Sequence, residues 1–272
     1  DYSNDGKKMV FLTFDDGSST TVTPEILKIL KENDVRATFF VTGENIERGG
    51  KKAEDLIKES FEYGNAIANH SYTHDYKYLY PGRTLNLDNF LADFNKTDEL
   101  LKKILGPYFS TRVIRCPGGH MSWKGMDQLD NYLNENNMAS IDWNALNADA
   151  EGRKKNAQEL ADYAIKTSQG KDIVVLLMHD TYGKEETAKA LPTIIKYFKD
   201  NGYEFNISEH WGIPCGYSVA CCNLVGCQEF PGTIRKRKTD NQRRKGIGSG
   251  FRFYFVEYAV CKWDIPVICL WW

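Results

Sequence analysis

Two adjacent carboxylates, Asp15 and Asp16, follow a short apolar run and precede a glycine. Further along the chain, His70 and His74 supply two imidazoles four residues apart. One carboxylate and two histidines make the three-ligand set of a catalytic zinc site, which leaves an open position for water. A second carboxylate beside such a site is placed to act as the base that deprotonates this water. The four residues therefore predict a hydrolytic metal centre.

Each pair also has an ordinary explanation when it is taken alone. An Asp-Asp-Gly sequence is a common turn after a strand, and two histidines can lie in a surface loop. The spacing of His70 and His74 would put both imidazoles on one side of a helical turn, as in many zinc sites. The joint occurrence of the two pairs favours the metal centre.

Three further segments place polar or aromatic residues at expected strand ends. Arg115 precedes a Cys-Pro-Gly-Gly turn, Trp143 ends an Ile-Asp-Trp segment, and His179 ends an apolar run that includes Leu177. A surface arginine, a core tryptophan and a hydrogen-bonded histidine would explain each segment separately. The occurrence of all five segments in one chain is harder to explain in this way.

The pattern of apolar residues predicts strands that alternate with helices over residues 8–207. The predicted strands are 8–14, 37–41, 66–68, 113–114, 140–143, 173–178 and 203–205. The predicted helices are 23–33, 53–63, 87–105, 126–136, 157–168 and 187–200. Such alternation indicates parallel βα units, and in barrels built from them the active site lies at the carboxyl ends of the strands. The chemically interesting residues follow predicted strands: Asp15, Asp16, His70, Arg115, Trp143 and His179.

Composition separates the last part of the chain from the rest. The 272 residues have a net charge of −2, but residues 208–272 carry six of the seven cysteines and a basic excess. The remaining body is acidic, which argues against nucleic acid as its partner. No apolar run reaches the length of about 18 residues that a membrane span needs. We therefore predict a main domain, 1–207, and an extension, 208–272, that need not be an independent domain.

The extension has two interpretations. Its cysteines could form a small disulfide-stapled module, or the segment could be a non-native extension without periodicity, which we slightly favour. The basic runs 235–238 and 243–245 could bind a polyanion, but such runs are more often solvated faces.

Together, the five ordered motifs resemble those of the polysaccharide deacetylase family, the NodB-like carbohydrate esterases. The motifs are Thr13–Gly17, His70–His74, Arg115–Pro117, Asp142-Trp143 and Leu177–His179. The resemblance covers residues 8–207 and implies an α/β fold of the distorted (β/α) barrel type.

The resemblance also implies a role for each motif residue. Asp16, His70 and His74 would hold a divalent metal, usually zinc, with cobalt or another transition metal as alternatives. Asp15 would be the base, kept ionised by Arg115, and His179 would be the acid. The remaining assignments are Trp143 and Leu177 for the acetyl slot, Gly118 for the oxyanion, and Asp149 for tuning His179, with Asp142 and Asp180 as alternatives to Asp149.

The implied reaction is removal of N-acetyl groups from a polysaccharide. We expect peptidoglycan N-acetylglucosamine as substrate, on general resemblance to bacterial members, with chitin-like polymers as an alternative. Acetylated xylan would instead make the protein an O-acetyl esterase. A non-catalytic carbohydrate-binding relative is a further alternative, but the presence of both Asp15 and His179 argues against it. The family and the missing initiator Met lead us to expect a secreted or cell-surface protein, and we expect a monomer.

Overall fold

The computed structural model describes residues 6–208, in which eight parallel strands form one sheet. The strands are β1 (Lys8–Gly17), β2 (Thr38–Val41), β3 (Ala66–Asn69), β4 (Val113–Ile114), β5 (Ala139–Ser140), β6 (Ala145–Leu146), β7 (Ile173–His179) and β8 (Tyr203–Asn206). The α-helices are α1 (Thr23–Glu32), α2 (Gly43–Glu62), α3 (Tyr76–Leu79), α4 (Leu87–Leu105), α5 (Asp127–Glu135), α6 (Ala157–Ser168) and α7 (Glu185–Asp200). Two short 3₁₀ helices, η1 (Pro81–Arg83) and η2 (His120–Ser122), complete the set.

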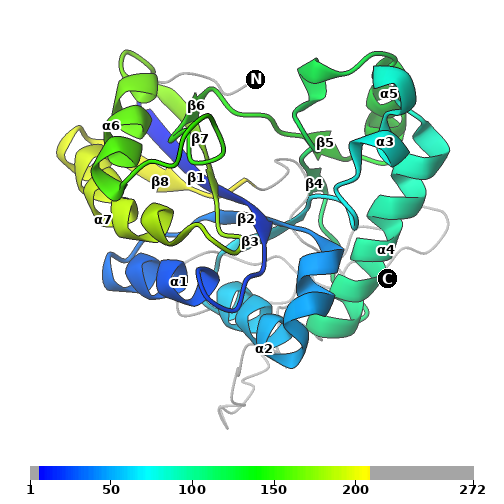
Figure 1. Cartoon of the computed structure of the whole chain (residues 1–272), viewed down its shortest axis with the longest axis horizontal. Helices are drawn as coiled ribbons and strands as arrows, with labels where there is room; N and C mark the ends of the chain where they lie inside the picture. The colour runs from blue at the N-terminus through cyan, green and yellow to red at the C-terminus, as the bar shows by residue number, and fades with distance from the viewer. Residues whose placement is uncertain (1–5, 209–272) are drawn as a thin grey trace, which may run out of the picture. The chain divides into compact units, whose positions relative to one another are not determined.

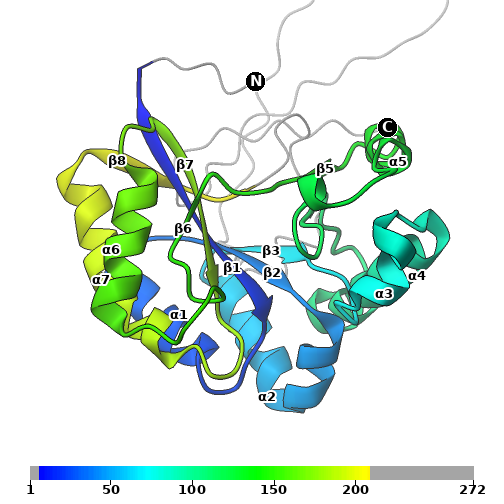
Figure 2. The same ribbon diagram turned by 45° about the horizontal axis from the view of Figure 1, so that its top comes forward.

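The sheet forms an incomplete barrel. Its strand order is β5-β4-β3-β2-β1-β7-β6, and within residues 6–208 no pairing closes the gap between β5 and β6. Strand β8 pairs with the first half of β1, on the side of β1 opposite to β7. Val10 shows this arrangement, because it pairs with β7 on one side and with β8 on the other. Helices α1, α2, α4, α6 and α7 surround the sheet (Figures 1 and 2). The predicted distorted (β/α) barrel is therefore confirmed.

Strand β1 is the centre of the core. Val10, Leu12 and Phe14 are buried in the large apolar cluster that joins the sheet to its helices. Thr13 and Asp15, on the other face of the strand, are buried as well. A parallel strand covered on both faces is expected to be continuously buried. This burial holds the end of β1, which carries the two adjacent aspartates, in a fixed position.

Two predicted elements differ from the structure. Helix α2 begins at Gly43, ten residues earlier than predicted. Its additional first part is joined to the predicted part across a break at Gly50, where φ is 55°. The strand predicted over 140–143 ends at Ser140. Beyond it, the carbonyl oxygens of Ile141 and Asp142 accept hydrogen bonds from Arg115 instead of a neighbouring strand.

Two further observations concern the chain as a whole. Across the described residues, no helix combines the length and the apolar character needed to cross a membrane. The extension predicted from residue 208 onward, with its six cysteines and basic runs, lies outside the described residues apart from Ser208. The boundary near residue 207 therefore stays a prediction.

Candidate active site

A β-bulge at the end of β1 brings both aspartates to the same place. In a regular strand, the neighbouring side chains of Asp15 and Asp16 would point to opposite faces. The register with β2 shifts between Asp15 and Gly17, and Asp16 adopts a φ of 64°. Such a bulge re-aims a side chain, and aspartate tolerates this left-handed conformation better than most residues. The Asp-Asp-Gly sequence is therefore a strand-end bulge that presents two carboxylates together.

Three side chains form the candidate metal site. One ligand atom each from Asp16, His70 and His74 lies within 4.8 Å of the other two. Asp16 Oδ1 is 3.6 Å from Nε2 of His70 and 3.6 Å from Nε2 of His74. The Oδ1 atom is buried and accepts no hydrogen bond from any described residue. A buried carboxylate oxygen without a partner, facing two imidazole nitrogens, fits a divalent cation.

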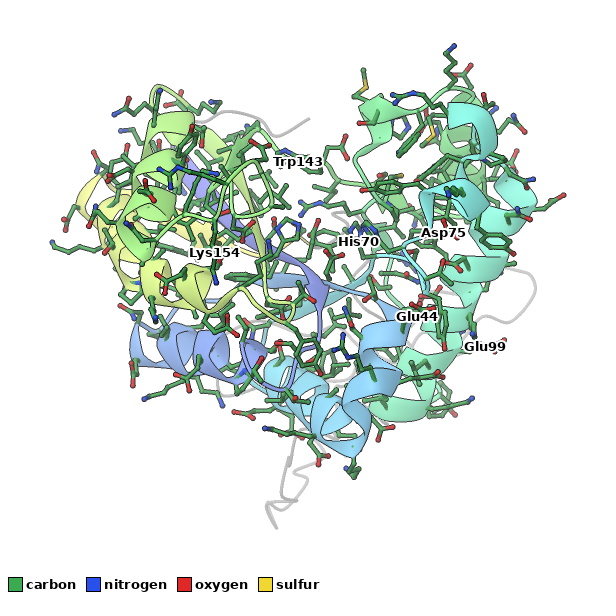
Figure 3. All side chains as sticks on the ribbon, viewed as in Figure 1. Glu44, His70, Asp75, Glu99, Trp143 and Lys154 are labelled. Carbon is green, nitrogen blue, oxygen red and sulfur yellow. The ribbon has the colours of Figure 1, made fainter. Side chains whose placement is uncertain are left out.

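His70 is prepared for metal binding by its surroundings. Its Nδ1 lies 2.8 Å from the carbonyl oxygen of Arg115, which orients Nε2 toward Asp16. Burial lowers the pKa of His70 to about 3. The imidazole is therefore neutral, which is the form that binds metals. Figure 3 labels His70 near the end of β1.

The loop that carries the two histidines is not helical. Ser71 and His74 have φ values of 72° and 54°, so the expected helical turn between the imidazoles was wrong. The loop is held instead by side-chain acceptors, because Asp93 of α4 accepts hydrogen bonds from the backbone N–H groups of Tyr72 and Thr73. These bonds fix His70 and His74 relative to each other without a helix.

The second carboxylate, Asp15, is held by a buried arginine. Arg115 Nη1 donates to Asp15 Oδ1 at 2.7 Å and to Thr13 Oγ1 at 2.9 Å, and Arg115 Nε donates to the Ile141 carbonyl. The Arg115 side chain is completely buried, and that of Asp15 is 3% exposed. The other oxygen of Asp15, Oδ2, lies 3.6 Å from His70 Nε2. Asp15 is thus at the edge of the metal site, with one oxygen held by Arg115 and the other facing the site.

His179 faces the same site from the end of β7. Its Nε2 lies 3.9 Å from Asp16 Oδ2, and its Nδ1 donates to Asp149 Oδ1 at 2.7 Å. Burial alone would lower the pKa of His179, but the hydrogen bond to Asp149 and the charges of Asp149, Asp15 and Asp16 raise it to about 9. The imidazole is therefore protonated at neutral pH, as a general acid requires.

Asp149, and neither of the alternatives Asp142 and Asp180, is the aspartate whose side chain forms hydrogen bonds with His179. Its Oδ2 accepts hydrogen bonds from the backbone N–H of His179 and from the hydroxyl of Thr187. Burial by itself raises the pKa of Asp149, but its bonds to His179 and Thr187 hold the value below its usual range. Asp142 instead accepts from the backbone of His120, and Asp180 accepts from Thr23.

The residues expected around the acetyl group lie on three different segments. Leu177 is half-buried and shares a strand face with His179, since the two are two residues apart in β7. Trp143 lies between β5 and β6, and its ring is 5.6 Å from the guanidinium of Arg115 (Figure 3). Gly118 has a φ of 76°, and a β-carbon there would come within 3.3 Å of the Tyr76 hydroxyl. The roles of these three residues in substrate binding stay predictions.

Two residues near the motifs stand apart from the metal site. Cys116 is a buried free thiol, and burial raises its pKa to about 12, so that it stays protonated. His120 Nε2 lies 2.7 Å from Asp130 Oδ1. Neither belongs to the group of potential metal ligands found among residues 6–208.

Sequence reasoning missed three positioning residues. Asp93 anchors the histidine loop, Thr187 donates to Asp149, and Thr13 both accepts from Arg115 and donates to the Leu176 carbonyl. Thr13 lies inside the first motif, and this place in the motif could have identified it as a positioning residue. Asp93 and Thr187 lie on helices far from the motifs in sequence, and no local pattern marks them.

Comparison with known proteins agrees with this arrangement. The family model described as polysaccharide deacetylase matches residues 2–138. A peptidoglycan-N-acetylglucosamine deacetylase of Bacillus cereus is 31% identical over 203 residues, which is 73% of this chain and 68% of the relative. A CE4 esterase structure from Streptococcus mutans superimposes with a TM-score of 0.70 at 37% identity, covering 74% of this chain and 86% of that one.

A second solved structure gives a similar result. The catalytic domain of a peptidoglycan N-acetylglucosamine deacetylase from Eubacterium rectale has a TM-score of 0.65 and 29% identity, covering 75% of this chain and 90% of that one. The family model spans half of this chain, and the B. cereus relative extends the similarity beyond it. The chain therefore belongs to the polysaccharide deacetylase family of carbohydrate esterases.

Proposed function

We propose that the protein is a metal-dependent deacetylase that removes N-acetyl groups from peptidoglycan N-acetylglucosamine. The observation that carries this proposal is the joint geometry of the site. A three-ligand cluster, a carboxylate held by Arg115 and an imidazole held by Asp149 face one another at the ends of β1, β3 and β7. This is the donor set that amide hydrolysis needs.

Asp16, His70 and His74 would hold the metal. A divalent ion with an open coordination position supplies Lewis-acid polarisation of a carbonyl group and lowers the pKa of water toward about 7. Zinc suits one carboxylate and two imidazoles, and cobalt suits the same ligands.

Asp15 and His179 would divide the proton transfers between them. Asp15 accepts the proton of the attacking water through Oδ2, because Oδ1 is occupied by Arg115. His179 then donates its Nε2 proton to the departing amine, so that acetate and a free amino group are released. A backbone N–H, such as that of Gly118, would stabilise the oxyanion. Base and acid catalysis each contribute about 10²–10⁴-fold in rate.

Peptidoglycan is preferred among the acetylated polymers because of the relatives. The B. cereus and E. rectale proteins are named peptidoglycan N-acetylglucosamine deacetylases. Because peptidoglycan is a cell-wall polymer, the proposal implies a secreted or cell-surface protein. The presence of both Asp15 and His179 supports catalysis over a non-catalytic sugar-binding role.

The test is acetate release by the purified protein from three polymers, namely peptidoglycan, chitin oligomers and acetylated xylan. We expect release from peptidoglycan, loss of this activity after chelation and recovery after addition of Zn²⁺. Release from xylan alone would make the protein an O-acetyl esterase. Unchanged activity after complete metal removal would contradict the proposed mechanism.

A further inference from the structure

The first part of α2, residues 43–49, lies against the segments that carry the candidate metal ligands. The backbone N–H of Gly43 donates to the carbonyl oxygen of Ser71 at 3.1 Å. The next N–H, that of Glu44, donates to the carbonyl oxygen of Tyr72 at 3.0 Å. Figure 3 labels Glu44 at this beginning of the helix. These bonds tie the beginning of α2 to the histidine loop.

Asn45, the next residue of the helix, joins two other parts of the site. Its Nδ2 donates to the backbone carbonyl oxygen of Asp16 at 2.8 Å. The same nitrogen donates to Oγ1 of Thr181 at 3.3 Å. Thr181 lies two residues beyond His179, the candidate acid. One amide nitrogen thus links a candidate metal ligand to the segment that follows the candidate acid.

The bond to Asp16 supports the β-bulge at the end of β1. Asp15 and Gly17 pair with β2, and Asp16 is the extra residue between them. The extra residue of a bulge is left out of the ladder, so its backbone groups need other partners. Asp16 also has a φ of 64°, which is a costly conformation for a residue with a β-carbon. The hydrogen bond from Asn45 holds the carbonyl of this residue, and with it the direction of the carboxylate.

The bond to Thr181 bears on the distance between the metal ligand and the acid. Asp16 Oδ2 lies 3.9 Å from His179 Nε2. The backbone N–H of Asp180 donates to a carbonyl oxygen of β1 at 3.2 Å, which continues the pairing of β1 with β7. Thr181 comes directly after this backbone bond, and the side chain of Asn45 supplies the next link. The carboxylate and the imidazole are therefore held together by one backbone link and one side-chain link.

We propose that Asn45 is a positioning residue that holds the candidate metal ligand Asp16 and the candidate acid His179 at their working separation. The bond to the Asp16 carbonyl supports metal binding, and the bond to Thr181 supports proton donation by His179. This inference rests on the proposed function for the roles of Asp16 and His179. It adds a residue that lies outside the five sequence motifs.

The test separates metal binding, turnover and stability. Competition with a chromophoric chelator, in the absence of substrate, gives the Kd of the full chain for Zn²⁺. Acetate release from peptidoglycan at saturating zinc gives kcat and KM. The melting temperature of the zinc-free protein reports stability. A residue that only stabilises the fold would change the melting temperature and leave the zinc Kd and kcat unchanged.

Asn45→Ala removes both bonds. We expect the Kd for zinc to rise about tenfold, because the bulge that presents Asp16 loses its support. We expect kcat at saturating zinc to fall about threefold to tenfold, with little change in KM, because the acid is displaced from the metal site. The matched control is Asn33→Ala, since Asn33 is also half-buried and its Nδ2 donates to the Ile29 carbonyl oxygen at 2.9 Å. The control should leave the zinc Kd and kcat unchanged.

Thr181→Val removes only the second bond and keeps the shape of the side chain. We expect kcat to fall about threefold and the zinc Kd to stay unchanged, because the bond to Asp16 remains. Combined with Asn45→Ala, it should reduce kcat no further, because the bond between the two residues is already absent. Thr181→Val also carries the test if Asn45→Ala fails to fold.

The outcomes distinguish the parts of the proposal. An unchanged zinc Kd in Asn45→Ala, or an equal rise in Asn33→Ala, would overturn the role of Asn45 in presenting Asp16. An unchanged kcat in Thr181→Val, or losses that add in the double variant, would overturn the link to the acid. Absence of acetate release by the unchanged protein would refute the proposed function. A higher zinc Kd in Asn45→Ala alone would still support the bond to Asp16 in that case.

Discussion

Substitution of Asp149 by asparagine should move the alkaline limb of the activity profile to lower pH. The change keeps the shape of the side chain and removes the charge that lies 2.7 Å from His179 Nδ1. This interaction, together with the charges of Asp15 and Asp16, raises the pKa of His179 from 6.5 to about 9. Because a general acid works only when protonated, activity is lost as the pH rises through this pKa.

The size of the effect follows from the protonated fraction of His179. At pH 8, a histidine with a pKa of about 9 is about 90% protonated, and one with a pKa of about 6.5 is about 3% protonated. Complete return of the pKa to its ordinary value would therefore reduce turnover at pH 8 about thirtyfold, with a much smaller loss at pH 6. In the variant, the remaining charges of Asp15 and Asp16 raise the pKa of His179 and burial lowers it, so a loss of about thirtyfold is the expected order of magnitude.

The assay is kcat as a function of pH between about pH 5 and 10, at saturating zinc and substrate. The control is Asp130→Asn, which removes a carboxylate at the same 2.7 Å distance from a different histidine, His120. This control should leave the profile unchanged. An alkaline limb that stays in place in Asp149→Asn would refute the role of Asp149 and the assignment of that limb to His179.

Three further predictions concern residues that position the site. Arg115→Met should lower the free energy of unfolding by about 3–5 kcal/mol, because it leaves Asp15 charged, buried and unpaired. A loss below about 1 kcal/mol, measured by urea titration, would contradict this role of Arg115. Asp93→Ala should weaken zinc affinity about 10–100-fold, because the loop that carries His70 and His74 loses its anchor. Most of kcat should be retained at saturating zinc. Unchanged zinc affinity in calorimetry would contradict the role of Asp93 in holding this loop. Gly43→Ala should lower the unfolding free energy by about 1–3 kcal/mol, since the new β-carbon would lie 2.0 Å from the ring of Tyr72. A melting temperature equal to that of the unchanged protein would show that Tyr72 can move aside without cost.

The strand ends are predictable from sequence because two independent signals coincide there. Apolar runs identify buried parallel strands, and chemically active side chains lie at or just after their carboxyl ends, at Asp15, His70 and His179. Parallel strands necessarily bring their carboxyl ends to one edge, so residues distant in sequence become neighbours. This is why the amino-acid sequence alone is enough to group the candidate metal ligands.

Conformation within the loops is not predictable in the same way. The spacing of His70 and His74 favours a helical turn, but Ser71 and His74 adopt positive φ values that a spacing rule does not contain. The first half of α2 is absent from the predicted helices because Gly43, Gly49 and Gly50 are typical of loops, although all three lie within the helix.

Supporting contacts are the hardest part to predict. Asp93 accepts hydrogen bonds from Tyr72 and Thr73, and Thr187 donates one to Asp149, but both lie on helices whose sequences are ordinary amphipathic patterns. Their importance arises from tertiary contacts alone, with α4 placed against the loop after β3 and α7 placed against Asp149. A short-range motif cannot encode such a contact.

The most direct test of the account is turnover by Asp15→Asn with its metal content measured in the same sample. Asparagine keeps the size of the side chain and its distance to Arg115, but it cannot accept the proton of the attacking water. We expect one zinc ion per chain, bound by Asp16, His70 and His74, and a decrease in kcat of about 10²–10⁴-fold on peptidoglycan. A fully loaded variant that releases acetate at the rate of the unchanged protein would contradict the account.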